Sequence, residues 1–412
     1  MNPVLSSSIN KMRNAEVDPI NIKAFERLFS IFESGDLGII SERDVESVTN
    51  IVEANALGSS IEFKIPNSKS LGAQSSVSSS DNFNSESDFR SSPMTKTVVI
   101  KLNGGLGTSM GLTRAKTLLE IAPNVNFLDV IAQQVLQLRD DFQTGLPLIF
   151  MNSYSTSTDT MNYLAKYPEL RQADLPLEFL QSKEPKLSID SHLPVEFPAN
   201  PQLEWCPPGH GDLYPTLYAT GLLNQLVELG YEVAFISNAD NLAAVVEPQI
   251  AEYFYENQFA FMNELTPKTA KDVKGGHLVR RKSDGRLLLR EFSQIAEVDI
   301  ESALSSDIHP YCNTNNIWVN LLKLQAVLQE NQGILSLPLI RNQKTVDPTD
   351  PKSEAVIQLE TAMGAACSCF DNATAIGVGR DRFQPVKNQV DLDDLQHNAH
   401  SILENIRSRV KL

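Results

Sequence analysis

The sequence predicts an α/β fold in which a mixed, mostly parallel β-sheet is flanked by helices. From residue 97 onward, short apolar runs rich in β-branched residues alternate with longer runs of helical periodicity. Alternation of this kind is typical of parallel strands covered by helices on both faces. Glycine-rich and polar segments also follow several expected strands directly, and ligands bind at that edge of such sheets. The pattern therefore predicts both the fold and the place of its chemistry.

The expected strands and helices alternate along the chain. Strands are expected at 97–102, 147–153, 177–182 and 231–240. Between them, apolar spacing predicts helices at 127–142, 156–170 and 214–230. Gly230 is placed to end the last of these helices.

The remaining residues divide the chain into four segments. Residues 1–66 are expected to form a helical N-terminal region, because 18–57 has helical apolar spacing and its "ISERDVESV" resembles a helix start. Residues 67–95 are dominated by serine and cannot bury enough apolar surface to offset their ordering entropy, so a flexible segment is expected. The α/β domain then spans 96–392, and 393–412 form a polar C-terminal helix or tail.

Composition excludes several classes of function. The 412 residues carry a net charge of -16, which argues against non-specific nucleic-acid binding. The four cysteines are too few and too scattered for a disulfide framework, and their spacing does not match a zinc site. The N-terminus does not resemble a secretory signal, and no apolar run has the length of a membrane span. We therefore expect a cytoplasmic protein that binds neither nucleic acid nor membrane.

The most informative segment is "TVVIKLNGGLGTSMGLTRAKTLLEI" at 97–121. Its four glycines follow a strand, where glycine permits positive φ and lets backbone N–H groups approach an anion closely. Lys116 is placed to add a point charge. A tight turn without a ligand is the simpler alternative. The glycines are Gly104, Gly105, Gly107 and Gly111.

Two familiar phosphate-binding loops do not match this segment. A Walker A loop is excluded because no glycine is followed directly by Lys-Ser or Lys-Thr. The spacing of Gly105, Gly107 and Gly111 is one residue longer than the dinucleotide fingerprint. Asp129 stands at a suitable distance for a ribose contact, but it lies in a helix-like run rather than at the end of a strand. Nucleotide phosphates without a nicotinamide remain.

Two later segments also follow expected strands or rigid loops. In "EWCPPGHGDLYPTL", two prolines precede Gly209 and His210 and a helix follows, an arrangement that suits a phosphate or a base edge, or a purely structural turn. In "FISNADNL", Asn238 and Asp240 end a buried strand. Such a carboxylate suits magnesium or ribose, because Mg²⁺ prefers hard oxygen ligands. An Asx turn or a helix cap is the alternative.

Three further segments carry polar residues in apolar surroundings. "NTNNIWVNL" contains Asn315 among four amides, which suit sugar hydroxyls or helix capping. "VIQLETAMGAA" places Glu360 in a helix-like apolar run, where a carboxylate is usually paired or faces a ligand. "RFQPVKNQVDL" puts Lys387 after a Pro-Val strand, and a surface lysine is the default interpretation.

Taken in order, these segments resemble the UTP–glucose-1-phosphate uridylyltransferases of the eukaryotic type. The resemblance extends from residue 97 to about residue 392, and "AFERLFSIFESGDLGII" resembles the helical N-terminal region of that family. It implies a glycosyltransferase-A-like nucleotidyltransferase fold, with 96–392 as the catalytic domain. It also implies Mg²⁺ as cofactor and UTP and glucose 1-phosphate as substrates, with in-line attack on the α-phosphate.

The resemblance assigns expected roles to the matched residues. Uracil would be read by Gln181 and the Gly209 backbone, and glucose 1-phosphate would be held by His210, Asn238, Asn315 and Glu360. Asp240 would hold magnesium and the nucleotide, while Lys116 and Lys387 would supply positive charge at the reacting phosphates. The UTP phosphates and base would be embraced by Leu102, Asn103, Gly104 and Gly105.

The chain departs from the family pattern after the catalytic lysine. It ends 25 residues beyond Lys387, where family members continue into a C-terminal β-helix used for oligomer contacts. We therefore expect that domain to be absent, which leaves oligomerisation open.

Four alternatives are weighed against this resemblance. A UDP-sugar pyrophosphorylase of broad specificity would share these motifs, and N-acetylhexosamine pyrophosphorylases would show a more basic glycine loop. The short C-terminus also fits a catalytically silent relative that binds UDP-sugar. An NAD-dependent oxidoreductase is disfavoured, because no acidic residue ends a second strand.

Overall fold

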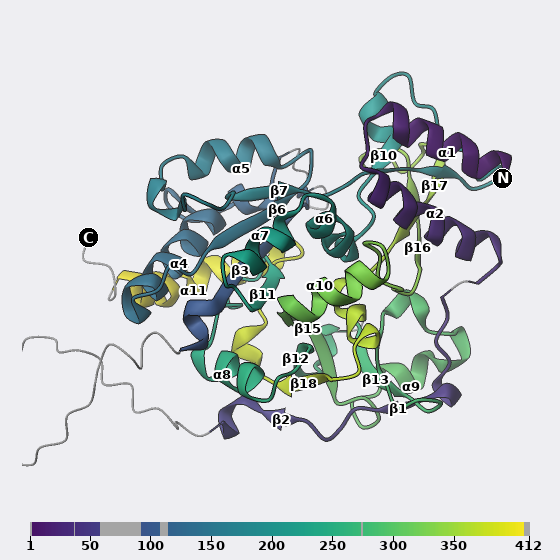
Figure 1. Ribbon diagram of the computed structural model, residues 1–412. Coiled ribbons are helices and arrows are strands. Elements are labelled where there is room, and N and C mark those ends of the chain that lie inside the picture. Colours follow the sequence, from purple (N-terminus) through teal and green to yellow (C-terminus); the bar gives the residue numbers. More distant parts are fainter. Residues whose placement is uncertain (1, 37, 58–91, 108–113, 273–274, 408–412) are drawn as a thin grey trace, which may run out of the picture.

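The computed structural model describes residues 2–36, 38–57, 92–107, 114–272 and 275–407, with side chains described as far as residue 399 (Figure 1). Within these ranges the chain is organised around one eight-stranded sheet of order β2-β18-β12-β15-β11-β3-β6-β7. Only β15 runs antiparallel to both of its neighbours, and the other pairs are parallel. The predicted mixed, mostly parallel sheet is therefore confirmed. Its strands are β2 Val52–Glu53, β3 Thr97–Asn103, β6 Leu148–Asn152, β7 Glu178–Leu180, β11 Val233–Asn238, β12 Phe261–Pro267, β15 Tyr311–Asn320 and β18 Ala373–Gly377.

Helices cover both faces of this sheet, and strand β3 shows how its residues are divided between them. Val98 and Ile100 face the core beneath α6 Leu213–Ala219, α7 Leu222–Glu228 and α10 Leu321–Glu330. Val99 faces the opposite core, which is covered by α4 Phe127–Phe142, α5 Ser157–Leu164, α8 Pro248–Glu256 and α11 Gln389–Arg407. Successive side chains of a strand point to opposite faces, so an apolar run such as this one has to be buried on both sides.

Smaller sheets and two N-terminal helices complete the fold. Helices α1 Pro3–Asn14 and α2 Pro19–Glu33 lie together beside β10, β16 and β17 (Figure 1). Phe25 and Phe29 of α2 pack there against Leu187 and Leu359. The sheet beneath them has the order β16-β17-β9. The remaining elements are β1 Val45–Ser47, β4 Glu120–Ala122, β5 Val125–Asn126, β8 Glu184–Pro185, β9 Leu187–Ser188, β10 Trp205–Cys206, β13 His277–Arg281, β14 Leu287–Arg290, α9 Ile300–Leu304, β16 Ile340–Thr345 and β17 Ala355–Glu360.

Several local predictions were wrong. The helical pattern over 18–57 ends at Glu33, and "ISERDVESV" forms a 3₁₀ turn that leads into β1. Strands β1 and β2 pair with β13 and β18, more than 200 residues away, and local apolar spacing carries no information about such partners. The helix expected at 214–230 is two helices, because Gly221 adopts a φ of +75° between them. The serine-rich prediction at 67–95 falls mostly outside the described residues.

Two predictions near the site residues were also wrong. Glu360 ends strand β17 rather than lying in a helix, because the run before it pairs with β16 and β9. Lys387 follows a loop rather than a Pro-Val strand. The predicted C-terminal helix is present as α11, which packs against α4 and β4.

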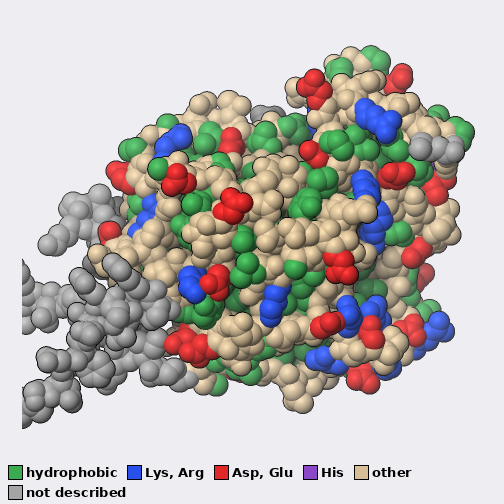
Figure 2. All heavy atoms as spheres, in the orientation of Figure 1, with side chains coloured by type: hydrophobic (Ala, Val, Ile, Leu, Met, Phe, Trp, Pro, Cys, Tyr) green, Lys and Arg blue, Asp and Glu red, His purple; other side chains and the backbone are tan. Residues whose placement is uncertain are grey.

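The surface view shows charged side chains of both signs. On the face in Figure 2, lysine and arginine side chains are interspersed with aspartate and glutamate. None of the helices in the described part of the chain combines the length and the apolar character of a membrane-spanning helix.

One buried ion pair ties distant parts of this fold together. Glu264 on β12 is fully buried, and its carboxylate accepts hydrogen bonds from Arg382 at 2.8 and 3.1 Å. The same carboxylate accepts bonds from Asn316 and Trp318 of β15, each at 2.9 Å. Arg382 follows β18, so the ion pair joins the central strands to the segment that leads to α11.

Removing this carboxylate is expected to destabilise the fold strongly. Glu264→Ala leaves the buried Arg382 guanidinium without its main partner, and loss of one member of a buried pair costs about 3–5 kcal/mol. Glu247→Ala is the matched control, because Glu247 contacts the same arginine at 3.1 Å but its side chain is 51% exposed. We expect that change to cost at most about 1 kcal/mol. Urea denaturation measures both, and equal losses would contradict the role assigned to Glu264.

Candidate active site

Most of the predicted site residues surround one cavity of about 270 Å³. The cavity lies at the carboxyl ends of β3, β6, β7 and β11, where a parallel sheet presents its loops to ligands. Thr117, Met151, Pro207 and Ala239 also line it and were not predicted. The predicted residues that line it are Leu102, Asn103, Gly104, Gly105, Lys116, Gln181, Gly209, His210, Asn238 and Asp240.

The start of the glycine loop is fixed by side-chain amides. Asn103 donates to Asn152 at 2.8 Å and to Thr160 at 2.9 Å, and it accepts from Thr117 at 2.8 Å. Its amide is therefore engaged by the protein, and the role open to Asn103 is to hold the loop in place. Beyond it, the Lys116 N–H donates to the Gly105 carbonyl at 3.3 Å, which returns the chain to the cavity.

The reason for glycine in this loop differs from the prediction. Gly104 and Gly105 do not adopt positive φ, and Gly111 lies outside the described residues. At Gly104 a Cβ would lie 2.6 Å from the Gln181 side-chain carbonyl oxygen, so a larger residue there would have to displace that side chain, which is bonded to Gly209. At Gly105 a Cβ would meet nothing within 4 Å, so this residue keeps open space beside the cavity.

Lys116 and Asp240 form an ion pair across the cavity. The Lys116 ammonium lies 2.7 Å from Asp240 Oδ2, and both side chains are partly buried. Asp240 Oδ1 is buried and has no hydrogen-bond partner among the described residues. An unsatisfied carboxylate oxygen fits a hard cation such as Mg²⁺, which commonly takes one or two carboxylates and completes its shell with water and phosphate oxygens. No group of three metal-ligating side chains occurs among the described residues, so substrate oxygens would have to complete the shell.

The opposite wall of the cavity is built by Gln181 and Gly209. Gln181 follows β7 and donates from Nε2 to the Gly209 carbonyl at 2.8 Å. Gly209 has a φ of +76°, and a Cβ there would lie 2.6 Å from the Thr361 carbonyl oxygen and 2.9 Å from Glu360 Cβ. Both observations require glycine, because other residues are strained at this φ and would clash with β17 and its extension.

His210 is held as a neutral ring. Its Nδ1 accepts a hydrogen bond from the Met363 N–H at 2.8 Å, so the proton of the neutral imidazole resides on Nε2. Burial lowers the pKa of His210 to about 4. At neutral pH the ring is therefore neutral, with its proton on Nε2, and the residue lines the cavity.

A buried lysine beneath the cavity was missed. Lys101 on β3 donates to Ser237 at 2.7 Å and to the Ala244 carbonyl at 2.6 Å, across the segment that carries Asp240. Burial, with a further contribution from Arg382, lowers the pKa of Lys101 to about 7. The sequence signal was present, since "VVIKL" places one lysine inside a strand that is buried on both faces.

Three predicted residues lie outside this cavity. Lys387 is exposed and lines a second cavity of about 520 Å³ with Lys271 and Arg380. Asn315 accepts a hydrogen bond from Asn313 at 2.8 Å, in a backbone conformation with φ +59°. Glu360 lies beside Gly209, as the close approach to its Cβ shows. The structure thus brings Glu360 next to the cavity wall but does not bring Lys387 to Lys116.

Backbone contacts nevertheless connect Lys387 to the Asp240 loop. The Val386 N–H donates to the Asp240 carbonyl at 3.2 Å. Asn241 donates to the Arg382 carbonyl at 3.0 Å and accepts from the Gln384 N–H at 3.1 Å. The segment that ends at Lys387 is therefore hydrogen-bonded to the loop that follows β11.

Known proteins resemble this chain in sequence and in fold. The family described as UTP--glucose-1-phosphate uridylyltransferase matches residues 48–409. The chain belongs to this family. A member from Encephalitozoon cuniculi (strain GB-M1), itself named UTP--glucose-1-phosphate uridylyltransferase, is 39% identical over 303 residues, which are 74% of this chain and 58% of that protein. A probable member from Schizosaccharomyces pombe is 33% identical over 97% of this chain and 74% of its own length.

Solved structures of the family have the same fold. UDP-glucose phosphorylase from Trypanosoma brucei matches with a TM-score of 0.83 and 37% identity, over 95% of this chain and 78% of that one. A mutant of UDP-glucose pyrophosphorylase from Leishmania major, solved in complex with UDP-glucose, matches with a TM-score of 0.82 and 38% identity, over 96% and 79%. The chain spans about three fifths of the length of the first curated relatives, 58% for Encephalitozoon and 63% for Astragalus penduliflorus.

The state of His210 can be tested by titration. With its pKa lowered to about 4 by burial, the ring should remain neutral between about pH 5.5 and 8. Its NMR signals, assigned by their loss in His210→Asn, should therefore not shift over that range. A titration midpoint near about 6.5, the ordinary value for histidine, would contradict the neutral donor.

Proposed function

We propose that this chain catalyses the formation of UDP-glucose and pyrophosphate from UTP and glucose 1-phosphate. The observation that carries the proposal is the convergence of ten predicted residues, from distant parts of the sequence, around one cavity at the carboxyl edge of the sheet. The names of the relatives support the same reaction. The proposal concerns the chain as given, which is shorter than those relatives.

The reaction asks little covalent chemistry of the protein. A phosphate oxygen of glucose 1-phosphate attacks the α-phosphorus of UTP in line, and the bond between the α-phosphorus and the bridging oxygen breaks to release pyrophosphate. The nucleophile is already an anion, so no general base is required. Positioning and charge neutralisation then account for most of the rate enhancement.

The Lys116–Asp240 pair supplies the charge on the nucleotide side. The two groups lie 2.7 Å apart and neutralise one another. Asp240 would hold Mg²⁺, which supplies neutralisation of phosphate charge when bound. With Asp240 engaged in this way, the Lys116 ammonium would be available to the phosphates. Lys101 and its bonds to Ser237 and Ala244 keep the Asp240 loop in place meanwhile.

The remaining residues recognise the two substrates. Gln181 and the Gly209 backbone face the same part of the cavity and suit the uracil edge, which presents both donors and acceptors. His210 suits a phosphate oxygen, because its neutral ring donates from Nε2. Asn238 lies beside it in the cavity wall. Asn315 and Glu360 are proposed to contact glucose hydroxyls from the adjoining side.

The cysteines support a location for this reaction. All four are free thiols, three of them buried, as is usual in a reducing compartment. We therefore place the enzyme in the cytoplasm.

The direct test is pyrophosphate release from UTP with Mg²⁺ and three sugar 1-phosphates assayed in parallel. We expect fast release with glucose 1-phosphate and slower release, by about tenfold or more, with galactose 1-phosphate and N-acetylglucosamine 1-phosphate. Similar rates with several sugars would replace the proposal by a pyrophosphorylase of broad specificity. Absence of release from folded protein that binds UTP would indicate a binding protein instead.

The role proposed for Lys387 has its own test. Because it would act only on charge at the reacting phosphates, Lys387→Ala should lower kcat roughly 100-fold or more and change the affinity for UTP less than about threefold. Lys271→Ala is the matched control, since Lys271 lines the same cavity with a side chain that is 81% exposed. That variant should retain parental turnover. Parental turnover in Lys387→Ala would refute the role.

A further inference from the structure

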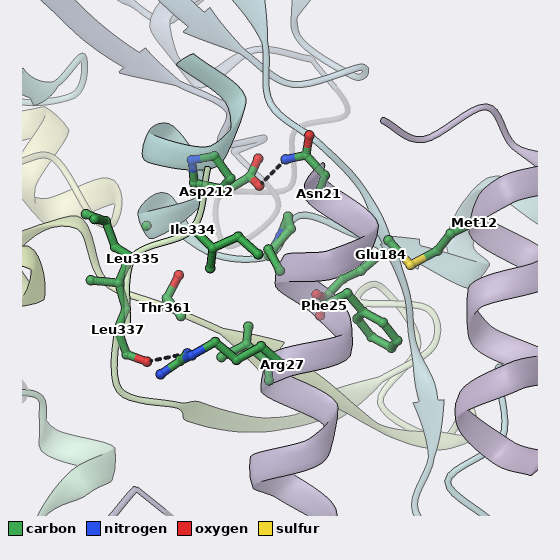
Figure 3. A pocket seen from close by; sticks show the side chains of 15 residues that line it. Met12, Asn21, Phe25, Arg27, Glu184, Asp212, Ile334, Leu335, Leu337 and Thr361 are labelled. Carbon is green, nitrogen blue, oxygen red and sulfur yellow. Dashed lines mark hydrogen bonds between the residues drawn. The ribbon is translucent and has the colours of Figure 1, made fainter. Parts of the chain in front are cut away.

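The N-terminal helix α2 reaches the back of the proposed uracil-binding wall through one side chain. Figure 3 shows Asn21 on α2 facing Asp212, which lies two residues beyond His210. Asn21 is 5% exposed, and its Nδ2 donates to Asp212 Oδ1 at 3.0 Å and to Thr216 Oγ1 at 3.0 Å. A buried amide that donates twice to one segment of the chain is a specific contact, because such groups are costly to bury without these partners.

Asp212 connects Asn21 to the strand end that carries Gln181, because its carboxylate accepts hydrogen bonds from both sides. Its second oxygen, Oδ2, accepts from the Ser182 N–H at 2.7 Å and from Thr216 Oγ1 at 3.0 Å. Ser182 directly follows Gln181, whose side chain donates to the Gly209 carbonyl. The carboxylate of Asp212 therefore connects both halves of the wall, and Asn21 occupies its remaining oxygen.

The other side of the same loop is attached to β17. The Gly211 N–H donates to the Thr361 carbonyl at 2.8 Å, and the Thr361 N–H donates to the Pro208 carbonyl at 3.0 Å. Residues 208–212 thus lie between the strand end proposed to read uracil and the strand end that carries Glu360. The position of this loop sets the distance between the two subsites.

We propose that Asn21 is a positioning residue for uridine-nucleotide binding, which acts through Asp212 on Gln181 and Gly209. This inference rests on the proposed function and adds the N-terminal helix to the binding machinery. Within the described part of the chain, the Asn21 amide donates to Asp212 and Thr216, and neither of these lines the nucleotide cavity. Its effect on the wall therefore passes through the Asp212 carboxylate.

The chemistry at this contact requires a neutral donor. Burial raises the pKa of Asp212 to about 6, and its three hydrogen-bond donors favour the ionised form against that effect. Glu184 on β8 is fully buried nearby, and burial raises its pKa well above the ordinary value for glutamate. Arg27 of α2 donates instead to the Leu337 carbonyl, as Figure 3 shows. Among the described residues, His210 within the loop and Glu360 beside Gly209 are further ionisable groups near this contact.

The first experiment measures UTP binding by calorimetry. Asn21→Ala should weaken the Kd for UTP about tenfold, because Asp212 supports the Gln181 strand end through the Ser182 N–H. The value of kcat at saturating UTP should change less than about threefold, because the Lys116–Asp240 pair does not depend on this contact. Ser30→Ala is the control on the same helix, since Ser30 is exposed and its hydroxyl donates to the Glu26 carbonyl of its own helix. That variant should bind UTP like the parent. An unchanged Kd for UTP in Asn21→Ala would overturn the inference, provided that a cooperative thermal denaturation curve shows that the variant is folded.

Exchange of the amide and the carboxylate between positions 21 and 212 tests whether Asn21 positions the uracil-binding wall or only stabilises the protein. Asn21→Asp sets two acceptor-only carboxylates against one another, so UTP binding should be weaker at about pH 8 than at about pH 6, where one of them holds a proton. The double variant Asn21→Asp with Asp212→Asn exchanges the two groups, so that the amide at position 212 donates to the carboxylate at position 21. At the higher pH it should recover at least half of the lost binding free energy.

The outcomes distinguish this inference from the function on which it rests. A double variant that binds UTP no better than Asn21→Asp alone, although folded, would overturn the role of Asn21. Parent protein that binds no UTP would overturn the proposed function, and with it the inference. Recovery in the double variant is not expected from a residue that only stabilises α2, because both substitutions would then add their losses.

Discussion

The site depends on a buried carboxylate that contacts no proposed ligand. Glu264 lies in the middle of the central sheet, and its bonds to Arg382, Asn316 and Trp318 join β12, β15 and the segment after β18. A charge without water requires every one of these partners, so the three segments have a single relative arrangement. The backbone carbonyl of Arg382 in turn accepts a hydrogen bond from Asn241, which directly follows Asp240. The ion pair therefore also helps to position the side of the cavity proposed to bind the metal.

The two sides of the cavity are supported in similar ways. The side with Lys116 and Asp240 rests on Glu264, and the side with Gln181 and Gly209 rests on Asp212. Each support is a carboxylate that accepts bonds from more than one element, which is how a loop obtains a fixed position without regular secondary structure. The loops themselves supply glycine and backbone groups to the cavity. The supporting carboxylates lie behind the residues expected to contact substrate.

Sequence reasoning succeeded where topology decides the outcome. The carboxyl ends of β3, β7 and β11 lie along one edge of the sheet, so motifs that follow those strands had to meet. It failed where partners are distant, as for β1 and β2, whose pairing strands lie more than 200 residues away. It also failed for Gly104, where the constraint is the approach of Gln181 rather than backbone φ. The role of Asn21 could not be predicted from the sequence either, because it depends on a contact with Asp212, a residue far away in the chain.

Charge balance in the cavity explains why Lys116 and Asp240 occur as a pair. Among the described residues that line it, these two carry the charges, and His210 is neutral because burial lowers its pKa to about 4. The cavity is therefore close to neutral within a chain of net charge -16, and its described lining has no excess of positive charge with which to attract a triphosphate. The proposed nucleotide would bring negative charge to Lys116, and the divalent cation proposed for Asp240 would bring positive charge to that carboxylate. Each member of the ion pair would then keep an opposite charge beside it in a partly buried site.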